Sequence, residues 1–225
     1  MKALNRNWNP GSARTLRPSC AAALLLVTAF ATGCAPLILG GAMVGGAAVA
    51  TDRRSVGIQL EDEAIESRVS HAIAARYDKI DRDVQRVNIT SYNRRVLLLG
   101  QVPSEAVREE VGRIAERTEN VRLVNNELTI GPAAPFSTGV NDAGVSTRVR
   151  AALLNDKDVR SGVIAVTTER NVVYLLGRVT EAEGELAAKV VSRTQAVSRV
   201  VKLFDYVTDQ ELADLRRSGD TAPSK

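Results

Sequence analysis

Two hydrophobic patterns recur in the same order along the chain, with a spacing of 77 residues. In the first, apolar and polar positions alternate, which is typical of a half-buried β-strand. In the second pattern, a run of apolar residues is almost continuous and contains one glycine. The repeated segments are 87–90 and 96–102 in the first copy, and 164–167 and 173–179 in the second. A repeat of this length predicts a duplicated domain, because the units of small solenoid repeats are shorter.

Short polar breaks separate the two strands of each copy and predict tight hairpin turns. Asn93 and Asn171 lie in these breaks, and asparagine tolerates the left-handed backbone that such turns need. The continuously apolar second strand is expected to lie centrally in its sheet. Gly100 and Gly177 inside these strands indicate either a bulge or a close approach of another backbone segment. No phosphate-loop lysine or dinucleotide-binding pattern surrounds either glycine.

Apolar positions three and four residues apart predict two helices in each copy. The predicted buried faces are Ile65, Val69, Ala72 and Ile73, then Val107, Val111, Ile114 and Ala115, and in the second copy Val145, Val149, Ala152 and Leu153, then Leu186, Val190 and Val191. Asp62, Glu63 and Glu66 would lie in a first helical turn, where the helix dipole favours acids. Thr180 and Glu183 have the spacing of a capping box. A third strand is expected at 121–128 and at 197–207, so each copy has the order helix, strand, strand, helix, strand. The predicted fold class is α+β.

The N-terminus has the features of a secretory signal. Lys2, Arg6, Arg14 and Arg17 form a basic leader without acids, and residues 21–31 are almost entirely small and apolar. This run is too short to span a bilayer comfortably, and small residues follow it, as at a cleavage site. We therefore interpret residues 1–33 as a signal peptide.

The residues around Cys34 resemble the lipobox of bacterial lipoproteins. Ala31-Thr32-Gly33 precede the cysteine, and the resemblance implies cleavage before Cys34, its diacylation through a thioether, and N-acylation. Several acyl chains anchor a protein stably, whereas a single chain binds a membrane only marginally. The alternative is an ordinary signal peptide with an unrelated cysteine. Ala35 after the cysteine resembles an outer-membrane sorting signal.

Residues 34–61 are interpreted as the acylated cysteine and a membrane-proximal tether. The segment is rich in small apolar residues and glycines, and a packed element is the alternative. Without the leader the chain has 26 basic and 26 acidic side chains. This balance gives no support for nucleic-acid binding, which needs a concentrated basic face. Cys20 would leave with the leader and Cys34 would be acylated, so no disulfide is expected.

The last strand of the first copy carries a family signature. Val121, Val124, Asn126 and Leu128, after an apolar strand that ends in Gly-x-Val and after a helix, resemble the BON domain. The second copy has Lys202 and Phe204 in place of the asparagine and the leucine. The chain resembles dual BON-domain outer-membrane lipoproteins, which implies tandem αββαβ domains, each a three-stranded mixed sheet packed on two helices. The expected parts are a signal peptide (1–33), a tether (34–61), BON domain 1 (62–130), a linker (131–140), BON domain 2 (141–208) and a C-terminal tail (209–225).

The resemblance also implies a non-enzymatic protein that binds anionic phospholipid, supports envelope integrity and is linked to cell division and envelope stress. Between residues 62 and 130 the net charge is −1, whereas between 141 and 208 it is +2, which favours domain 2 as the lipid-binding part. The predicted lipid-binding residues are Gly144, Val145, Arg148 and Arg150. Gly144 lies where relatives have a large apolar residue. The alternative is that the two arginines only keep the helix solvated.

A second hypothesis is a protein-interaction adaptor for outer-membrane assembly or division machinery. A hydrolase is disfavoured, because catalysis needs a perturbed group with a partner in a cleft. The chain has one histidine, His71, and we expect it to face solvent. No set of metal ligands is visible, so neither a cofactor nor a metal is expected.

Overall fold

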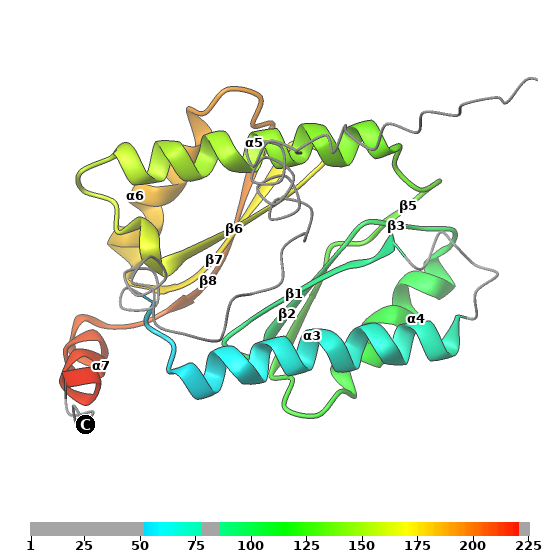
Figure 1. Ribbon diagram of the computed structural model, residues 1–225, viewed down its shortest axis with the longest axis horizontal. Helices are drawn as coiled ribbons and strands as arrows, with labels where there is room; N and C mark the ends of the chain where they lie inside the picture. The colour runs from blue at the N-terminus through cyan, green and yellow to red at the C-terminus, as the bar shows by residue number, and fades with distance from the viewer. Residues whose placement is uncertain (1–51, 78–85, 221–225) are drawn as a thin grey trace, which may run out of the picture. The chain divides into compact units, whose positions relative to one another are not determined.

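The computed structural model describes residues 52–77 and 86–220, which contain two αββαβ modules (Figure 1). The elements of module 1 (residues 56–130) are α3 (Val56–Arg76), β1 (Asn88–Tyr92), β2 (Arg95–Leu99), β3 (Gln101–Val102), α4 (Glu105–Glu116), β4 (Leu123–Asn126) and β5 (Thr129–Ile130). The elements of module 2 (residues 136–206) are α5 (Phe136–Asn155), the 3₁₀ turn η2 (Ser161–Val163), β6 (Ile164–Glu169), β7 (Val172–Val179), α6 (Glu181–Ser192) and β8 (Arg199–Tyr206). A last helix, α7 (Asp209–Asp220), follows.

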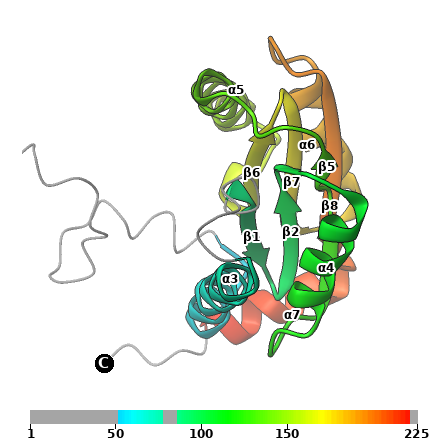
Figure 2. The same ribbon diagram turned by 90° about the vertical axis from the view of Figure 1, so that its right-hand side faces the viewer.

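Both modules contain a three-stranded mixed sheet, as predicted. In module 1 the order is β1-β2-β4, with β1 antiparallel and β4 parallel to β2. In module 2 the order is β6-β7-β8 with the same directions, and β7 runs between β6 and β8 (Figure 2). The parallel pairing follows from the helix that crosses over between the second and third strands. In module 1 the short pair β3-β5 continues the pattern beyond Gly100.

The central strands are continuously apolar because both faces of each sheet are covered. Along β2, Val96 and Leu98 belong to the core of module 1 with α3 and α4, whereas Leu97 and Leu99 point to the opposite face, as the two-residue period of a strand requires. That opposite face meets module 2. The inter-module core consists of Tyr92, Leu97, Leu99, Tyr174 and Leu176. The predicted central position of β2 and β7 is confirmed.

The two repeated glycines mark close approaches between backbone segments, one of the two predicted alternatives. A Cβ atom added to Gly177 would lie 2.5 Å from the carbonyl oxygen of Val163. At Gly100 the corresponding distance to the carbonyl oxygen of Arg86 is 3.0 Å, and the backbone has a φ of +120°. The second strand of each copy therefore carries glycine because another main-chain segment passes over it.

Replacing Gly177 with alanine is expected to destabilise the protein by about 1–3 kcal/mol, since the added methyl would collide with fixed backbone. Gly139 in α5 is the matched control, because a Cβ there has no heavy atom within 4 Å. The Gly139→Ala variant should be neutral or more stable by up to about 1 kcal/mol, because alanine favours helix. Urea unfolding of both variants measures the difference, and equal stability of the two would contradict this account of Gly177.

Both first helices begin earlier than the sequence predicted. Helix α3 begins at Val56 with Ser55 as its cap, whose hydroxyl accepts from the Ile58 N–H at 3.3 Å. Helix α5 begins at Phe136. The expected tether (34–61) and linker (131–140) therefore include the first turns of helices. For α3 the difference arises because Asp62 was expected in the first helical turn, whereas it lies inside the helix.

The predicted C-terminal tail (209–225) contains the helix α7. Its start is a capping arrangement in which the Thr208 hydroxyl accepts from the Glu211 N–H and the Glu211 carboxylate accepts from the Thr208 N–H. Leu212 is 7% exposed, so the helix packs on the protein. The predicted signal peptide, Cys34 and the tether as far as residue 51 lie outside the described residues.

Candidate membrane-facing helix and its polar supports

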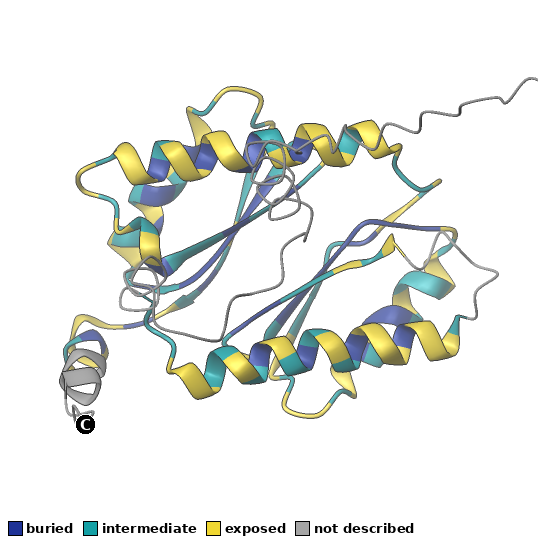
Figure 3. Ribbon diagram, in the orientation of Figure 1, coloured by how far each residue is buried: buried dark blue, intermediate teal, exposed yellow. Residues whose placement is uncertain are grey.

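Helix α5 has one side buried in module 2 and the other side open to solvent (Figure 3). Val145, Val149 and Leu153 are at most 1% exposed and belong to the core of module 2. An apolar stripe at this spacing fixes the rotation of the helix about its own axis. The rotation in turn decides which side chains face solvent.

The solvent side of α5 carries three large apolar side chains, which we call the apolar ridge. Phe136 is 88% exposed, Val140 57% and Leu154 73%. Phe136 and Leu154 are 18 residues apart, about five helical turns, and therefore lie on the same side. Single exposed apolar residues are ordinary, but a group on one face indicates a binding surface.

The predicted lipid-binding residues take different positions on α5. Arg148 is exposed and lies beside Gly144, with its Nη1 atom 3.6 Å from the position of an added Cβ. Arg150 is also exposed, and its Nη2 donates to the carbonyl oxygen of Val166 on β6 at 2.8 Å. Val145 is fully buried. The helix thus brings Gly144 and Arg148 together, places Arg150 at the edge of the sheet, and turns Val145 into the core.

Sequence reasoning missed the apolar ridge, although a signal was present. Val56 and Leu60 of α3 precede Phe136 and Val140 by 80 residues, and they are 61% and 59% exposed. Both first helices therefore begin with an exposed apolar pair four residues apart. The sequence-based prediction does not include these pairs, because the residues before 62 and before 141 fall in its expected tether and linker.

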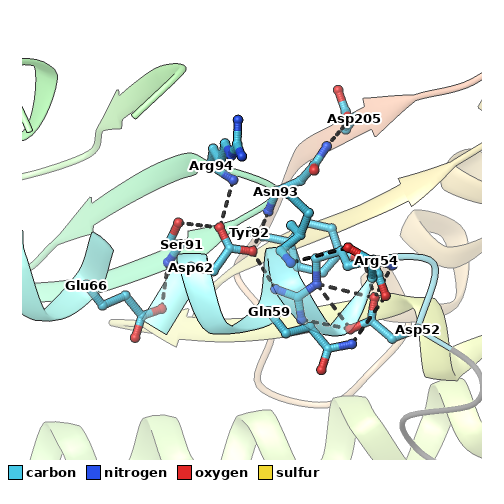
Figure 4. A network of polar contacts seen from close by, with 12 residues as sticks. Asp52, Arg54, Gln59, Asp62, Glu66, Ser91, Tyr92, Asn93, Arg94 and Asp205 are labelled. Carbon is cyan, nitrogen blue, oxygen red and sulfur yellow. Dashed lines mark hydrogen bonds and ion pairs between the residues drawn. The ribbon is translucent and has the colours of Figure 1, made fainter. Parts of the chain in front are cut away.

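The carboxylate of Asp62 on α3 holds the first hairpin (Figure 4). It accepts from the backbone N–H groups of Asn93 at 2.8 Å and Arg94 at 2.7 Å, and from the Ser91 hydroxyl at 2.8 Å. Asn93 and Arg94 have φ of 52° and 63°, the left-handed conformation of a tight turn. Asp62 is 2% exposed, so these donors supply the partners that a buried charge requires.

Module 2 repeats this arrangement. The carboxylate of Asp142 on α5 accepts from the backbone N–H groups of Arg170 at 2.8 Å and Asn171 at 2.9 Å. Both turn residues again have positive φ. Asp62, which was expected to interact with a helix dipole, therefore ties α3 to the first hairpin, and Asp142 ties α5 to the second.

Arg54 joins the start of the described chain to module 1. Its guanidinium lies 2.7 Å from Asp52 and 2.8 Å from Asp62, and 4.0 Å above the ring of Tyr92 (Figure 4). Burial raises the pKa of Tyr92 to about 12, and the charge of Asp52 acts in the same direction. Burial likewise raises the pKa of Glu66, which accepts from the backbone N–H of Ser91.

Arg53 joins the same segment to module 2. Its Nη2 and Nη1 atoms donate to Glu183 at 2.6 and 2.7 Å, and Nη1 also donates to the carbonyl oxygen of Arg178 at 2.7 Å. The hydrogen bonds from Arg53 are the largest cause that lowers the pKa of Glu183 to about 2. Glu183 also completes the predicted capping box with Thr180. We call Arg53, Glu183 and Arg178 the Arg53 clasp.

Further polar contacts cross between the modules. Asp205 on β8 accepts from Asn93 Nδ2 at 2.6 Å and from Arg122 Nη2 at 3.0 Å. Gln101 Nε2 donates to Glu169 at 2.8 Å. These polar contacts and the inter-module core together join the two modules.

His71 is exposed, as predicted, and its Nδ1 atom lies 3.3 Å from the Ser67 hydroxyl. Within residues 52–77 and 86–220, no three His, Cys, Asp or Glu side chains form a group that could hold a metal ion. In the same ranges, no helix has both the length and the apolar character to cross a bilayer.

Comparisons with known proteins agree with the repeat. The BON domain family model matches residues 61–132 and 141–208. The chain is 37% identical over 199 residues to the outer membrane lipoprotein DolP of Haemophilus influenzae, covering 86% of this chain and 99% of that protein. It is 31% identical to a 21 kDa hemolysin of Actinobacillus pleuropneumoniae, covering 69% of this chain and 79% of that protein. A solved structure of CdsD, a type III secretion protein of Chlamydia trachomatis, covers 72% of this chain and 70% of that chain with a TM-score of 0.27 and 11% identity.

Proposed function

Because this chain belongs to the BON-domain family and is a non-enzymatic outer-membrane lipoprotein with two copies of that domain, we propose that it binds anionic phospholipid through α5 of module 2. Acylation of Cys34 supplies the permanent anchor. The observation that carries the proposal is the apolar ridge of α5 together with its exposed arginines. One helix thus carries both an apolar surface that can insert into a bilayer and basic side chains that can contact anionic headgroups.

The magnitudes favour a weak contact that works beside a strong anchor. Moving a Phe or Leu side chain from water into an apolar environment contributes about 1.5–3 kcal/mol. Each Lys or Arg near an anionic surface adds about 1 kcal/mol. Part of this gain offsets the lost freedom of association. We therefore expect α5 to orient a protein that its acyl chains already hold at the membrane.

The charge distribution supports module 2 over module 1. Between residues 56 and 67, at the start of α3, the exposed apolar pair is followed by Glu61 and Glu63. Between residues 136 and 147, at the start of α5, the only charged side chain is Asp142, which is 5% exposed and holds the hairpin. The acids of α3 would be repelled by an anionic surface, whereas α5 offers Arg148 and Arg150.

The test uses the mature chain with Cys34→Ala, so that binding does not depend on acylation. We expect it to bind phosphatidylglycerol vesicles at low salt and phosphatidylcholine vesicles much more weakly. Phe136→Ser should weaken binding about tenfold or more, because at least about 1.5 kcal/mol of apolar transfer is lost. Replacing Arg148 with Gln should weaken binding about fivefold at low salt, and less at high salt, where charges are screened.

Val56→Ser is the matched control, since Val56 occupies in module 1 the position that Phe136 has in module 2. It should leave vesicle binding unchanged. Vesicle flotation or light scattering measures the affinity for the vesicles. If the Phe136→Ser and Arg148→Gln variants bind the vesicles with the same affinity as the unchanged chain, α5 is not the lipid-binding face.

A further inference from the structure

The Arg53 clasp lies beside the loop that follows α5. The Nε atom of Arg160 in that loop is 3.9 Å from the same Glu183 carboxylate that binds Arg53. The first described residues of the chain are therefore held next to the loop that leads out of the C-terminal end of α5. Leu154 is exposed there, and so are Lys157 and Arg160.

We propose that the Arg53 clasp orients the protein on the membrane. By fixing the end of the N-terminal segment to module 2, it presents the C-terminal end of α5, with Leu154, Lys157 and Arg160, to the lipid surface ahead of the Phe136 end. This inference rests on the proposed function, since it requires an acylated Cys34 and a lipid-binding α5.

The Arg53 clasp lies close along the chain to the expected acylation site. Only 17 residues separate Cys34 from Asp52, and whatever conformation they take, their far end is bound at the clasp. The Phe136 end of the ridge lies about 27 Å from Leu154 along the helix. The effective concentration of a tethered group falls as its distance from the attachment point grows. The membrane contact nearest to the clasp is therefore favoured.

The geometry of the Arg53–Glu183 pair makes the clasp a firm attachment. The Arg53 side chain is 8% exposed and binds both oxygens of one carboxylate, the fork arrangement that makes such pairs strong and specific in direction. By contrast, Arg160 reaches Glu183 only at 3.9 Å and its side chain is 59% exposed, as in surface pairs that contribute little. Arg53 is thus a fixed attachment, whereas the Arg160 guanidinium remains accessible to a lipid headgroup.

The experiment uses the acylated mature protein in vesicles that contain phosphatidylglycerol. A single cysteine is introduced as Leu154→Cys or Phe136→Cys and labelled with an environment-sensitive fluorophore. The introduced thiol is the only free one when Cys34 is acylated and Cys20 is removed with the leader. Quenching by lipid-borne spin labels and by aqueous iodide measures how deeply each position enters the bilayer. With an intact clasp, we expect position 154 to be better shielded from iodide than position 136.

Arg53→Gln should abolish this difference, so that both positions are shielded equally. Arg53→Lys should reduce it, because lysine lacks the planar fork of two N–H groups that fixes the direction of the pair. Arg122→Gln is the control for loosened modules, since it removes an ion pair with Asp205 but no contact of Arg53 or Glu183, and it should keep the original difference. Thermal unfolding of each variant verifies that it is folded.

The outcomes separate the two proposals. Equal shielding with the clasp intact, a difference that survives Arg53→Gln, or a difference that Arg122→Gln also abolishes overturns the clasp as an orienting device. If neither position enters the bilayer and the Cys34→Ala chain fails to bind phosphatidylglycerol vesicles, the proposed function itself is wrong.

Discussion

Replacing Asp62 with asparagine should destabilise the protein by about 3 kcal/mol or more. The substitution keeps the shape of the side chain but removes its charge and places an NH₂ group where one oxygen accepts hydrogen bonds. The turn N–H groups of Asn93 and Arg94 compete for the remaining oxygen, and the ion pair to Arg54 is lost. A buried donor left without an acceptor costs more than a hydrogen bond contributes when formed.

Glu63→Gln is the matched control for this prediction, because it removes a neighbouring acid on the same helix whose side chain is exposed. It should change the free energy of unfolding by less than about 0.5 kcal/mol. Asp142→Asn should have an intermediate effect, since its carboxylate binds the second hairpin but forms no ion pair with an arginine guanidinium among the described residues. Urea unfolding gives all three values, and a similar small effect for Asp62 and Glu63 would refute the hairpin role.

Leu97→Ala should destabilise the protein by about 2–5 kcal/mol, the usual cost of a cavity in a closed core. Leu97 is fully buried, but it lies on the face of β2 that points away from α3 and α4, and its neighbours in the inter-module core include Tyr174 and Leu176 of module 2. The size of the effect therefore reports whether the modules pack together. Without module 2 over this face, the side chain would be exposed to water and its truncation would cost far less.

Leu123→Ala serves as the control, since Leu123 is an apolar residue of the same sheet and is 44% exposed. Its truncation should cost less than about 0.5 kcal/mol. Equilibrium unfolding monitored by circular dichroism should also show a single transition for the unchanged protein, because the modules share a core. An effect of Leu97→Ala as small as that of Leu123→Ala would mean that the modules do not bury this face.

The order of elements in each module was predictable because it depends on local patterns. Alternating and continuous apolar runs identified the strands, and apolar spacings of three and four identified the helices. The family signature also has a local structural role. Asn126 donates to the carbonyl oxygen of Arg108 at 2.9 Å and accepts from Leu128 N–H at 3.3 Å, so it ties β4 to α4. In module 2, Lys202 instead forms an ion pair with Glu185.

The proposed site was predictable only in part. The lipid-binding role came from the family resemblance and the choice of module 2 from net charge, and the structure leaves Arg148 and Arg150 of α5 exposed. Val145 was included because it follows Gly144 in sequence, yet adjacent helical residues are about 100° apart around the axis, and its direction is inward. Phe136 and Val140 were assigned to a linker because a proline precedes them and no side chain caps the helix.

The sequence alone determined the duplication, the αββαβ order of each copy and the central position of the apolar strands. Each of these properties depends on the repeat spacing, or on the period that a helix or a strand imposes on residues close together in the chain. Only the tertiary structure decided what covers the second face of each sheet, which acids hold the hairpins, and where the N-terminal segment is bound. These contacts join residues far apart, such as Arg53 and Glu183 at a separation of 130 positions, and no local period records which of many compatible partners the folded chain brings together.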